Sequence, residues 1–295
     1  MRILYLLPHC STGGMPQYVV RQVQDFLEGN EIFVLEVDFY GEQYVVQRNR
    51  LQVICTFDSL YGNQALLQSK IEQINPEVIH CQELPEKFLD QPNLEYLYKQ
   101  DRTWFVVVTS HSSLTYGQSF DRYPDKLVAV NNWQKNLFLT QLPTVPCDIW
   151  EFPIESKEVT PEQKIQKKLE LGMDINRKHI LNVGLFTPGK NQGELFEIAR
   201  VNPQNTYHFV GNQAPNFENY WGPLMQNKPA NCVVWGEKDD VDIFYQVCDE
   251  FYFPSTFELN PICIKEALSY GLPCKIRKFP TYGNDYDNNP LVTYI

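Results

Sequence analysis

Short runs of apolar residues recur along the chain and alternate with segments of helical pattern. The runs are continuous in valine, isoleucine and leucine, which is typical of parallel strands buried on both faces. In the first half of the chain, the predicted strands are Ile3–Leu7, Ile32–Val37, Val53–Phe57, Val78–His80, Phe105–Thr109 and Leu127–Val130. The predicted helices between them are Met15–Glu28, Gln64–Gln73, Asn93–Lys99 and Asn132–Thr140. Residues 1–150 are therefore expected to form one doubly wound α/β domain.

A proline- and charge-rich stretch follows Leu142, and after a polar helix at Pro161–Leu171 the same alternation begins again. Strands are predicted at His179–Val183, Thr206–Val210, Cys232–Trp235, Glu250–Phe253 and Pro273–Arg277, and helices at Asn191–Val201, Val241–Val247 and Ile262–Tyr270. The segment Asn212–Pro229 is rich in Asn, Pro and Gly, so its pattern leaves helix and loop equally open. Residues 151–295 are thus expected to form a second α/β domain. Two such sheets in tandem favour a ligand site at the carboxyl ends of their strands.

The length of 295 residues fits two domains of ordinary size, and a hydrophobic content of 43% fits a large core. The net charge is −11 and neither half is basic, which argues against nucleic acid as a partner and against docking on anionic lipid. No apolar run reaches the ~18 residues of a transmembrane segment, and the first strand is too short for a signal peptide. We therefore expect a cytoplasmic protein.

The eight cysteines form no CxxC pair and mostly lie in or beside predicted strands and helices. This arrangement predicts reduced, partly buried thiols rather than disulfides or a zinc site. Asp285-Tyr-Asp287 matches a DxD pattern that binds metal in a different transferase architecture, but it lies in a polar tail rich in Asn and Gly. We expect it to be a solvated turn.

The most informative segment runs from Thr256 to Cys274 and reads as a loop, a helix and the start of a strand. Glu258 lies in the loop, and Glu266 follows eight residues later on the helix. A helix that begins near Pro261 would direct its free N–H groups at an anion. Side chains on a helix lean toward its amino end, so Glu266 is expected to reach the same opening that Glu258 borders. The segment predicts a phosphate site with a carboxylate on each side.

Two further loops between a strand and a helix suit phosphate. Gly184-Leu-Phe-Thr-Pro-Gly-Lys190 ends in a lysine just before a helix, where a compact cation can offset charge on a departing phosphate. A solvated lysine at a helix start is the plain alternative. Gly13 and Gly14 follow the first strand and permit close backbone approach to a ligand, although the loop is neither GxGxxG nor a P-loop and a purely structural glycine turn remains open.

His111 follows the predicted strand at Phe105–Thr109, which places it at a carboxyl end, and His80 ends another strand in the same way. Either imidazole can bind a sugar hydroxyl or move a proton near neutral pH. A single histidine at a strand end is more often structural, and we expect that role for His80.

In these residues the chain resembles the retaining glycosyltransferases of family 4, which have the GT-B fold of two facing Rossmann-like domains. The family signature is a glutamate, seven further residues, a second glutamate, and a helix that continues to Gly-Leu-Pro. Glu258, Glu266 and Gly271-Leu-Pro are similar to it here. The resemblance extends along nearly the whole chain. It includes the opening strand and glycine loop, the segment Asn75–His80, the strand that ends at His111, the strand end Ala129-Val-Asn-Asn, and the loop Val183–Lys190.

The resemblance implies a role for each matching residue. Glu266 would hold the ribose and Glu258 the hydroxyls of the donor sugar, while Lys190 would contact the diphosphate together with the amides of Ile262 and Cys263. The remaining positions are on the first domain: Gly13 and Gly14 would lie close to the phosphate and the acceptor, and His111 would contact the sugar near the reacting carbon. No metal or other cofactor is implied, because the lysine and the helix dipole offset the charge.

The chain departs from the family pattern in three places. The usual arginine of the phosphate loop is absent from Leu185-Phe-Thr, Pro261 replaces a glycine, and the chain stops ~20 residues after the fifth predicted strand of the second domain. The last feature suggests either a compact version of the fold or a shortened chain.

The resulting hypothesis is a hexosyltransferase that moves a sugar from a UDP- or GDP-linked donor to a hydroxyl acceptor in glycan biosynthesis, with retention at the anomeric carbon. The alternative is a non-catalytic GT-B-like protein that binds a nucleotide or glycan or serves in assembly. A nucleotide-sugar epimerase of the same fold carries less weight, and a nicotinamide dehydrogenase is disfavoured because neither half has GxGxxG with a distal acid.

Overall fold

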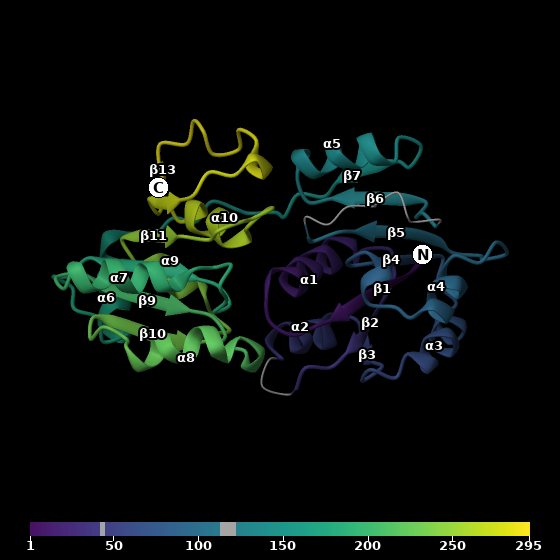
Figure 1. Cartoon of the computed structure of the whole chain (residues 1–295), viewed down its shortest axis with the longest axis horizontal. Coiled ribbons are helices and arrows are strands. Elements are labelled where there is room, and N and C mark those ends of the chain that lie inside the picture. Colours follow the sequence, from purple (N-terminus) through teal and green to yellow (C-terminus); the bar gives the residue numbers. More distant parts are fainter. Residues whose placement is uncertain (42–44, 113–121) are drawn as a thin grey trace. The chain divides into compact units, whose positions relative to one another are not determined.

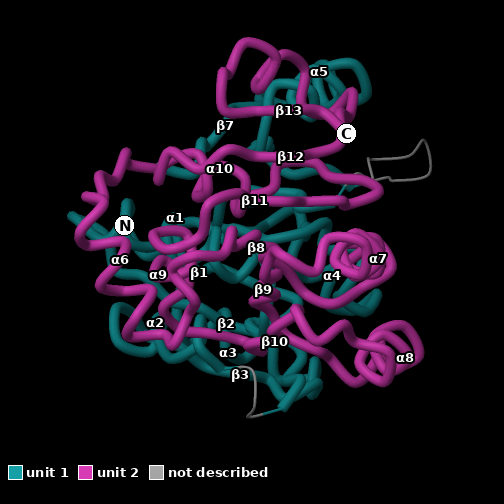
Figure 2. Tube along the Cα trace, turned by 90° about the vertical axis from the view of Figure 1, so that its left-hand side faces the viewer, with its two compact units in different colours: residues 1–153 teal, residues 154–295 magenta. Residues whose placement is uncertain are grey.

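The protein was analysed as a computed structural model that describes residues 1–41, 45–112 and 122–295. The chain divides into two compact units, Met1–Pro153 and Ile154–Ile295. Figure 1 labels their helices and strands, and Figure 2 colours the two units. Each unit has its own sheet and its own core.

Unit 1 contains seven parallel strands in the order β3-β2-β1-β4-β5-β6-β7. The strands are β1 Arg2–His9, β2 Glu31–Asp38, β3 Thr56–Ser59, β4 Val78–Cys81, β5 Phe105–Thr109, β6 Lys126–Ala129 and β7 Cys147–Ile149. The helices are α1 Gly14–Phe26, α2 Val46–Ile54, α3 Leu67–Ile74, α4 Gln91–Leu97 and α5 Asn132–Gln141. Short 3₁₀ turns lie at Gln64–Leu66 and Pro85–Lys87. The reversal of strand order between β1 and β4 is the point at which such sheets bind ligands.

Unit 2 contains six parallel strands in the order β10-β9-β8-β11-β12-β13. The strands are β8 His179–Val183, β9 Thr206–Val210, β10 Cys232–Gly236, β11 Glu250–Phe253, β12 Cys274–Ile276 and β13 Val292–Tyr294. The helices are α6 Pro161–Glu170, α7 Gln192–Val201, α8 Glu218–Gln226, α9 Asp242–Val247 and α10 Ile262–Ser269, with 3₁₀ turns at Pro215–Phe217 and Pro280–Tyr282. Here the order reverses between β8 and β11.

Both faces of each sheet carry apolar side chains, as continuous apolar strands require. In unit 2, one cluster packs Phe251 and Phe253 against Ile264 of α10, and the other packs Tyr252 against Phe196 of α7. Figure 2 shows α7 and α8 on one side of this sheet and α9 on the other. The side chains of the successive residues 251–253 thus lie on opposite faces of the sheet, and the helices bury both faces.

The expected doubly wound α/β architecture is confirmed, and most predicted elements agree with the structure within two residues. The predicted strand Val53–Phe57 is partly wrong, because Val53 and Ile54 end α2 and the strand begins at Thr56. The undecided segment Asn212–Pro229 contains α8. Helix α2 and the short strands β7 and β13 were not predicted, since the two strands are only three residues long.

Candidate functional site

In unit 2, the loop after β11 leads into α10 as the sequence predicts, and Pro261 is the residue that precedes the first helical turn. The first bond of the helix runs from the Ile264 N–H to the Pro261 carbonyl at 3.3 Å. The N–H groups of Ile262 and Cys263 come before that bond, so they have no acceptor within the helix. The amino end of α10 therefore has the donors and the dipole that favour an anion.

Lys190 and Glu258 form an ion pair beside this helix. The Lys190 Nζ lies 2.5 Å from Glu258 Oε1 and 5.0 Å from the centre of the Phe253 ring. The Ser255 hydroxyl donates to the same carboxylate oxygen at 2.5 Å, and its oxygen also lies 2.9 Å from the Gly189 carbonyl oxygen. The Lys190 and Glu258 side chains keep 29% and 11% of their surface exposed. The structure thus brings together the lysine of one loop and the glutamate of another.

Glu266 has a different partner. The Tyr245 hydroxyl of α9 donates to Glu266 Oε2 at 2.9 Å. Burial raises the pKa of the Cys263 thiol; Lys190 opposes this shift, while the carboxylates of Glu258 and Glu266 add to it. Both glutamates and the lysine therefore act electrostatically on one residue in the first turn of α10. That the two carboxylates border one opening stays a prediction.

The Gly184 loop makes a close backbone contact with the neighbouring strand end. A Cβ on Gly211, whose φ is +151°, would lie 2.0 Å from the Gly184 carbonyl oxygen. The Gly184 N–H donates to the Val210 carbonyl at 2.9 Å, and the stem of Lys190 lies over Gly184. Leu185, which follows Gly184 in this loop, is half-buried. Gly211 is thus a structural requirement of this loop that sequence reasoning did not single out.

Arg277 follows β12 and is a second cation near the loop that carries Glu258. Its guanidinium pairs with Glu194 and also donates to the Pro254 carbonyl, directly before Ser255. The Asn191 side-chain amide donates to Glu194 at 2.9 Å and to Pro254 at 3.4 Å. Sequence reasoning missed Arg277; the only available signal was a basic residue at the carboxyl end of a predicted strand.

In unit 1, Gly13 precedes α1 with a φ of +118°, a conformation that glycine adopts at no cost. An added Cβ would meet nothing within 4 Å at Gly13 or Gly14, so no packing contact in unit 1 explains the absence of side chains there. The backbone conformation is the structural reason for Gly13. Open space around both residues is compatible with a ligand that approaches the loop.

His111 follows β5 and is held by buried polar residues from several elements. Its Nε2 lies 3.0 Å from Gln82 Oε1, and its ring packs edge to face against Tyr18 at 4.8 Å. Burial lowers the pKa of His111 to about 4, with Glu83 opposing the shift and Lys87 adding to it. The imidazole is therefore neutral at pH 7. Gln82, which bonds to the ring, and Gln134, which bonds to the Ser110 carbonyl, were not identified from the sequence because glutamine carries no motif.

His80 lies on β4 and is 7% exposed, and its Nε2 bonds to the Thr109 hydroxyl at 2.8 Å. Burial lowers its pKa to about 3, and the neighbouring His111 and Lys126 lower it further. A neutral, buried and hydrogen-bonded ring fits the structural role expected for His80.

Asp285 and Asp287 lie on exposed turns, and Asp287 pairs with Lys278 at 2.7 Å, as a solvated turn predicts. All eight cysteines are free thiols. Within residues 1–41, 45–112 and 122–295, no group of three or more His, Cys, Asp or Glu side chains is arranged to hold a metal ion. No helix in the same ranges combines the length and the apolar character needed to cross a membrane.

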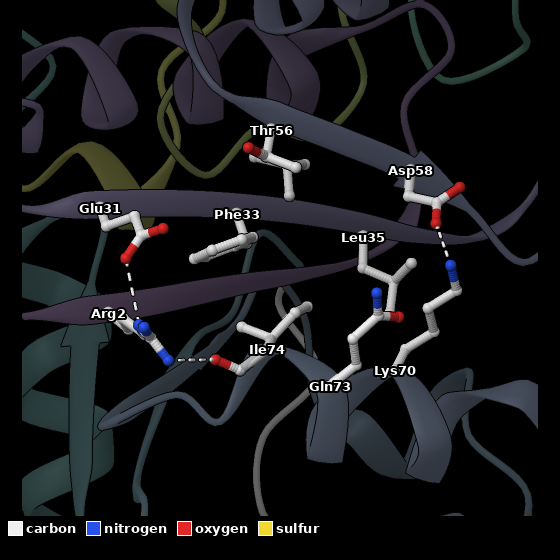
Figure 3. Close-up of a pocket in the computed structure, with 10 residues that line it drawn as sticks. Arg2, Glu31, Phe33, Leu35, Thr56, Asp58, Lys70, Gln73 and Ile74 are labelled. Atoms are coloured by element: carbon white, nitrogen blue, oxygen red, sulfur yellow. Dashed lines mark hydrogen bonds and ion pairs between the residues drawn. The ribbon is translucent and has the colours of Figure 1, made fainter.

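A separate pocket of about 260 Å³ lies on unit 1 between the sheet and α3 (Figure 3). Phe33, Leu35 and Ile74 form its apolar part, and its charged residues are already paired, Arg2 with Glu31 at 3.1 Å and Lys70 with Asp58 at 2.5 Å. Arg2 and Glu31 begin their strands, so the pocket extends to the amino ends of β1 and β2. It is therefore distinct from His111 and the glycine loop, which lie at carboxyl ends.

Comparison with known proteins relates the chain to glycosyltransferases. No protein-family model matches the chain. A processive diacylglycerol alpha-glucosyltransferase of Acholeplasma laidlawii is 28% identical over 113 residues, which are 37% of this chain and 34% of the relative. A UDP-Gal:alpha-D-GlcNAc-diphosphoundecaprenol alpha-1,3-galactosyltransferase of Escherichia coli is 26% identical over 179 residues, 57% of this chain and 44% of the relative. The chain thus spans less than half the length of these curated relatives.

Solved structures match nearly the whole chain. HepE of Anabaena, in complex with UDP and glucose, has a TM-score of 0.79 at 15% identity, over 99% of this chain and 85% of HepE. WaaG, a glycosyltransferase of lipopolysaccharide biosynthesis, has a TM-score of 0.70 at 14% identity, over 99% of this chain and 85% of WaaG. These findings confirm the resemblance to the GT-B glycosyltransferases of family 4: the chain has the GT-B fold and is related in sequence to glycosyltransferases.

Proposed function

We propose that the chain is a glycosyltransferase that transfers a hexose from a nucleotide diphosphate sugar to a hydroxyl acceptor with retention of configuration. The observation that carries the proposal is the pairing of Lys190 with Glu258 beside the amino end of α10, on a GT-B fold. The sequence relatives support the transfer of glucose or galactose, and the complexes of HepE with UDP and with UDP-glucose support a UDP-linked donor.

In this proposal unit 2 binds the donor. The N–H groups of Ile262 and Cys263 and the ammonium of Lys190 bind the diphosphate, Glu266 binds the ribose, and Glu258 binds hydroxyls of the sugar. When the donor binds, the Lys190 ammonium contacts phosphate oxygens and gives up part of its contact with Glu258. Because these groups offset the charge of the leaving phosphate, the proposed reaction is independent of a metal ion.

The proposed reaction breaks the bond between the anomeric carbon and the phosphate oxygen, and the electron pair passes to the diphosphate. The acceptor oxygen bonds to the same face of the carbon and loses its proton, which the released diphosphate can take up. Unit 1 serves the acceptor side, and its Gly13, Gly14 and His111 are the residues that the family resemblance implies for substrate contacts. A cytoplasmic location and the absence of nucleic-acid partners stay predictions from the sequence.

The proposal is tested by measuring binding and transfer with the same preparation. UDP-glucose, UDP-galactose and GDP-mannose are screened by thermal shift, where a ligand at ~100 times its dissociation constant adds ~2.7 kcal/mol to the free energy of unfolding. Transfer to lipid and glycan hydroxyl acceptors is then followed by release of free UDP or GDP. Failure of every nucleotide sugar to bind, together with no effect of Glu266→Ala on the melting temperature in the presence of UDP, contradicts the proposal.

A second candidate is a GT-B protein that binds a nucleotide or a glycan without catalysis. The specific observation in its favour is that Leu185-Phe-Thr lacks the arginine that the family resemblance implies for the phosphate loop, together with Pro261 where it implies a glycine. Nucleotide binding with neither transfer nor hydrolysis in the same screen distinguishes this candidate from the enzyme.

A further inference from the structure

The His111 ring is connected to two buried glutamines by a chain of hydrogen bonds. Its Nε2 bonds to Gln82 Oε1 at 3.0 Å, and Gln82 Nε2 donates to Gln22 Oε1 of α1 at 2.9 Å. Gln82 follows β4 and is fully buried, and Gln22 is 1% exposed. Both amides are buried, and these hydrogen bonds connect them to the imidazole of His111.

The direction of these hydrogen bonds determines the tautomer of His111. Because Gln82 donates through Nε2 to Gln22, its Oε1 faces the imidazole, and a carbonyl oxygen only accepts hydrogen bonds. The His111 Nε2 must therefore carry a proton. In the neutral ring Nδ1 is then unprotonated, and no hydrogen-bond partner of Nδ1 is found among the described residues.

The backbone on both sides of His111 is held as well. Gln134 of α5 is 1% exposed, and its Nε2 donates to the Ser110 carbonyl at 3.0 Å and to the Ser112 carbonyl at 3.3 Å. The edge-to-face contact with Tyr18 limits rotation of the ring. The ring thus has a fixed position, and among the described residues only its Nε2 has a hydrogen-bond partner.

We propose that Gln82 is a positioning residue that fixes His111 as the Nε2–H tautomer, so that Nδ1 accepts a hydrogen bond from a sugar hydroxyl of the substrate. The inference rests on the proposed function for the identity of the partner, but the tautomer itself follows from unit 1 alone. In this proposal the two ring nitrogens have different roles: Nε2–H donates to Gln82 and keeps the ring in place, and Nδ1 accepts a hydrogen bond from the ligand.

The charges around His111 agree with a neutral ring. Glu83 lies beside it, but its carboxylate already accepts bonds from the Ser110 hydroxyl at 2.9 Å and from Lys87 at 3.1 Å. His80 is the other titratable ring nearby, and its own pKa is lowered to about 3 by burial first and then by His111 and Lys126. Tyr18 contributes a ring edge and donates its hydroxyl to the Trp150 carbonyl at 3.2 Å.

Nitrogen NMR of the full chain, labelled with ¹⁵N in histidine, tests the tautomer directly. The five histidines are assigned by one substitution each, and His111 is expected to show a protonated Nε2 and an unprotonated Nδ1 at pH 7. A protonated Nδ1, or equal populations of both forms, overturns the inference. The measurement requires no substrate, so it stays decisive even where no transfer activity is found.

Two substitutions extend the test to the reaction. Gln82→Met removes the acceptor, so His111 is expected to populate both tautomers and kcat to fall by ~10-fold or more. Gln82→Glu keeps an acceptor and adds a negative charge, so the Nε2–H form persists and the acid limb of the kcat/KM profile moves up by about 1 to 2 pH units. An unchanged tautomer and kcat in Gln82→Met overturn the positioning role.

Gln64→Met is the matched control, because Gln64 also donates from a side-chain amide in unit 1, to the Phe88 carbonyl at 2.9 Å, and is not bonded to His111. It is expected to leave the tautomer and the pH profile unchanged. The Nε2–H form in a protein that transfers no sugar contradicts the proposed function but not the role of Gln82. Transfer by a protein whose His111 carries the proton on Nδ1 contradicts only the inference made here.

Discussion

The ammonium of Lys190 lies 2.5 Å from the carboxylate of Glu258, although 68 residues separate them in the sequence. Lys190 comes from the loop after β8 and Glu258 from the loop after β11, and these two strands are neighbours at the reversal point of the sheet. The pair thus occupies the place where a doubly wound sheet binds ligands. A lysine held at this point is available to a diphosphate before the ligand arrives.

Lys190→Ala is expected to lower kcat/KM by ~10²- to 10³-fold, because it removes a cation that offsets charge on the leaving phosphate. Steady-state kinetics with UDP-glucose measure the loss, and calorimetry with UDP measures the accompanying loss of affinity. Lys178→Ala is the control, since Lys178 pairs with Glu250 at 2.7 Å in the same unit but precedes β8. Equal effects of both substitutions contradict a specific role for Lys190.

Leu185→Arg introduces a guanidinium into the stretch Leu185-Phe-Thr, where the family resemblance implies an arginine, and is expected to strengthen UDP binding by ~10-fold. An arginine binds phosphate oxygens in a bidentate manner, and Leu185 is half-buried at the loop that Lys190 ends. Titration calorimetry with UDP and with uridine separates the contribution of the diphosphate to binding from that of the nucleoside, because only UDP carries the diphosphate. An equal gain for both ligands, or none for UDP, shows that the loop does not face a phosphate.

Much of the fold could be predicted from the sequence because buried parallel strands are continuous apolar runs, as at Phe105–Thr109, which the structure reproduces residue for residue. The two glutamates around α10 could be predicted because their spacing fixes their places on a loop and a helix. Gln82 and Gln134 could not, since their importance comes from hydrogen bonds between residues far apart in sequence. Strand β7 escaped because three residues, Cys147–Ile149, carry no detectable period.

Gly211→Ala is expected to lower the free energy of unfolding by ~2 kcal/mol or more, because the added Cβ would lie 2.0 Å from the Gly184 carbonyl oxygen. Both atoms belong to backbone or are fixed to it, so the two strand ends must separate. Urea unfolding measures the change. Gly222→Ala in α8 is the control, since its Cβ meets only Glu218 Cγ at 3.8 Å, and it is expected to lower the free energy of unfolding much less than Gly211→Ala does.

The stability of unit 2 is expected to depend on a hydrogen-bond chain of two buried histidines. Trp235 Nε1 donates to His208 Nδ1 at 3.0 Å, His208 Nε2 bonds to His179 Nδ1 at 2.8 Å, and His179 Nε2 bonds to the Asp174 carbonyl at 2.8 Å. Because Trp235 only donates, each ring must carry its single proton on Nε2 for every bond to form. A second proton on His208 would face the indole N–H, so all three hydrogen bonds form only when both histidine rings are neutral.

Burial lowers the pKa of His208 to about 3 and also lowers the pKa of His179. The unfolded chain takes up protons near pH 6.5 while the folded chain does not, so stability is fully present above pH 6.5 and is lost as the pH falls below it. Each histidine that stays neutral adds a slope of ~1.4 kcal/mol per pH unit once its unfolded form is protonated. His9, His80 and His111 act in the same direction, because burial lowers their pKa values too.

Denaturant unfolding between pH 7.5 and 6 measures this slope in a window where carboxylates titrate little in the unfolded chain, since their ordinary pKa values lie near 4. Proton NMR of the folded protein is expected to show no titration of the His208 ring over the same range. Trp235→Phe removes the indole donor, so His208 Nδ1 becomes able to accept a proton, and the slope is expected to be shallower than in the unsubstituted chain. A His208 ring that titrates near pH 6.5 in the folded protein contradicts the hydrogen-bonded arrangement of neutral histidines, because protonation then breaks no hydrogen bond.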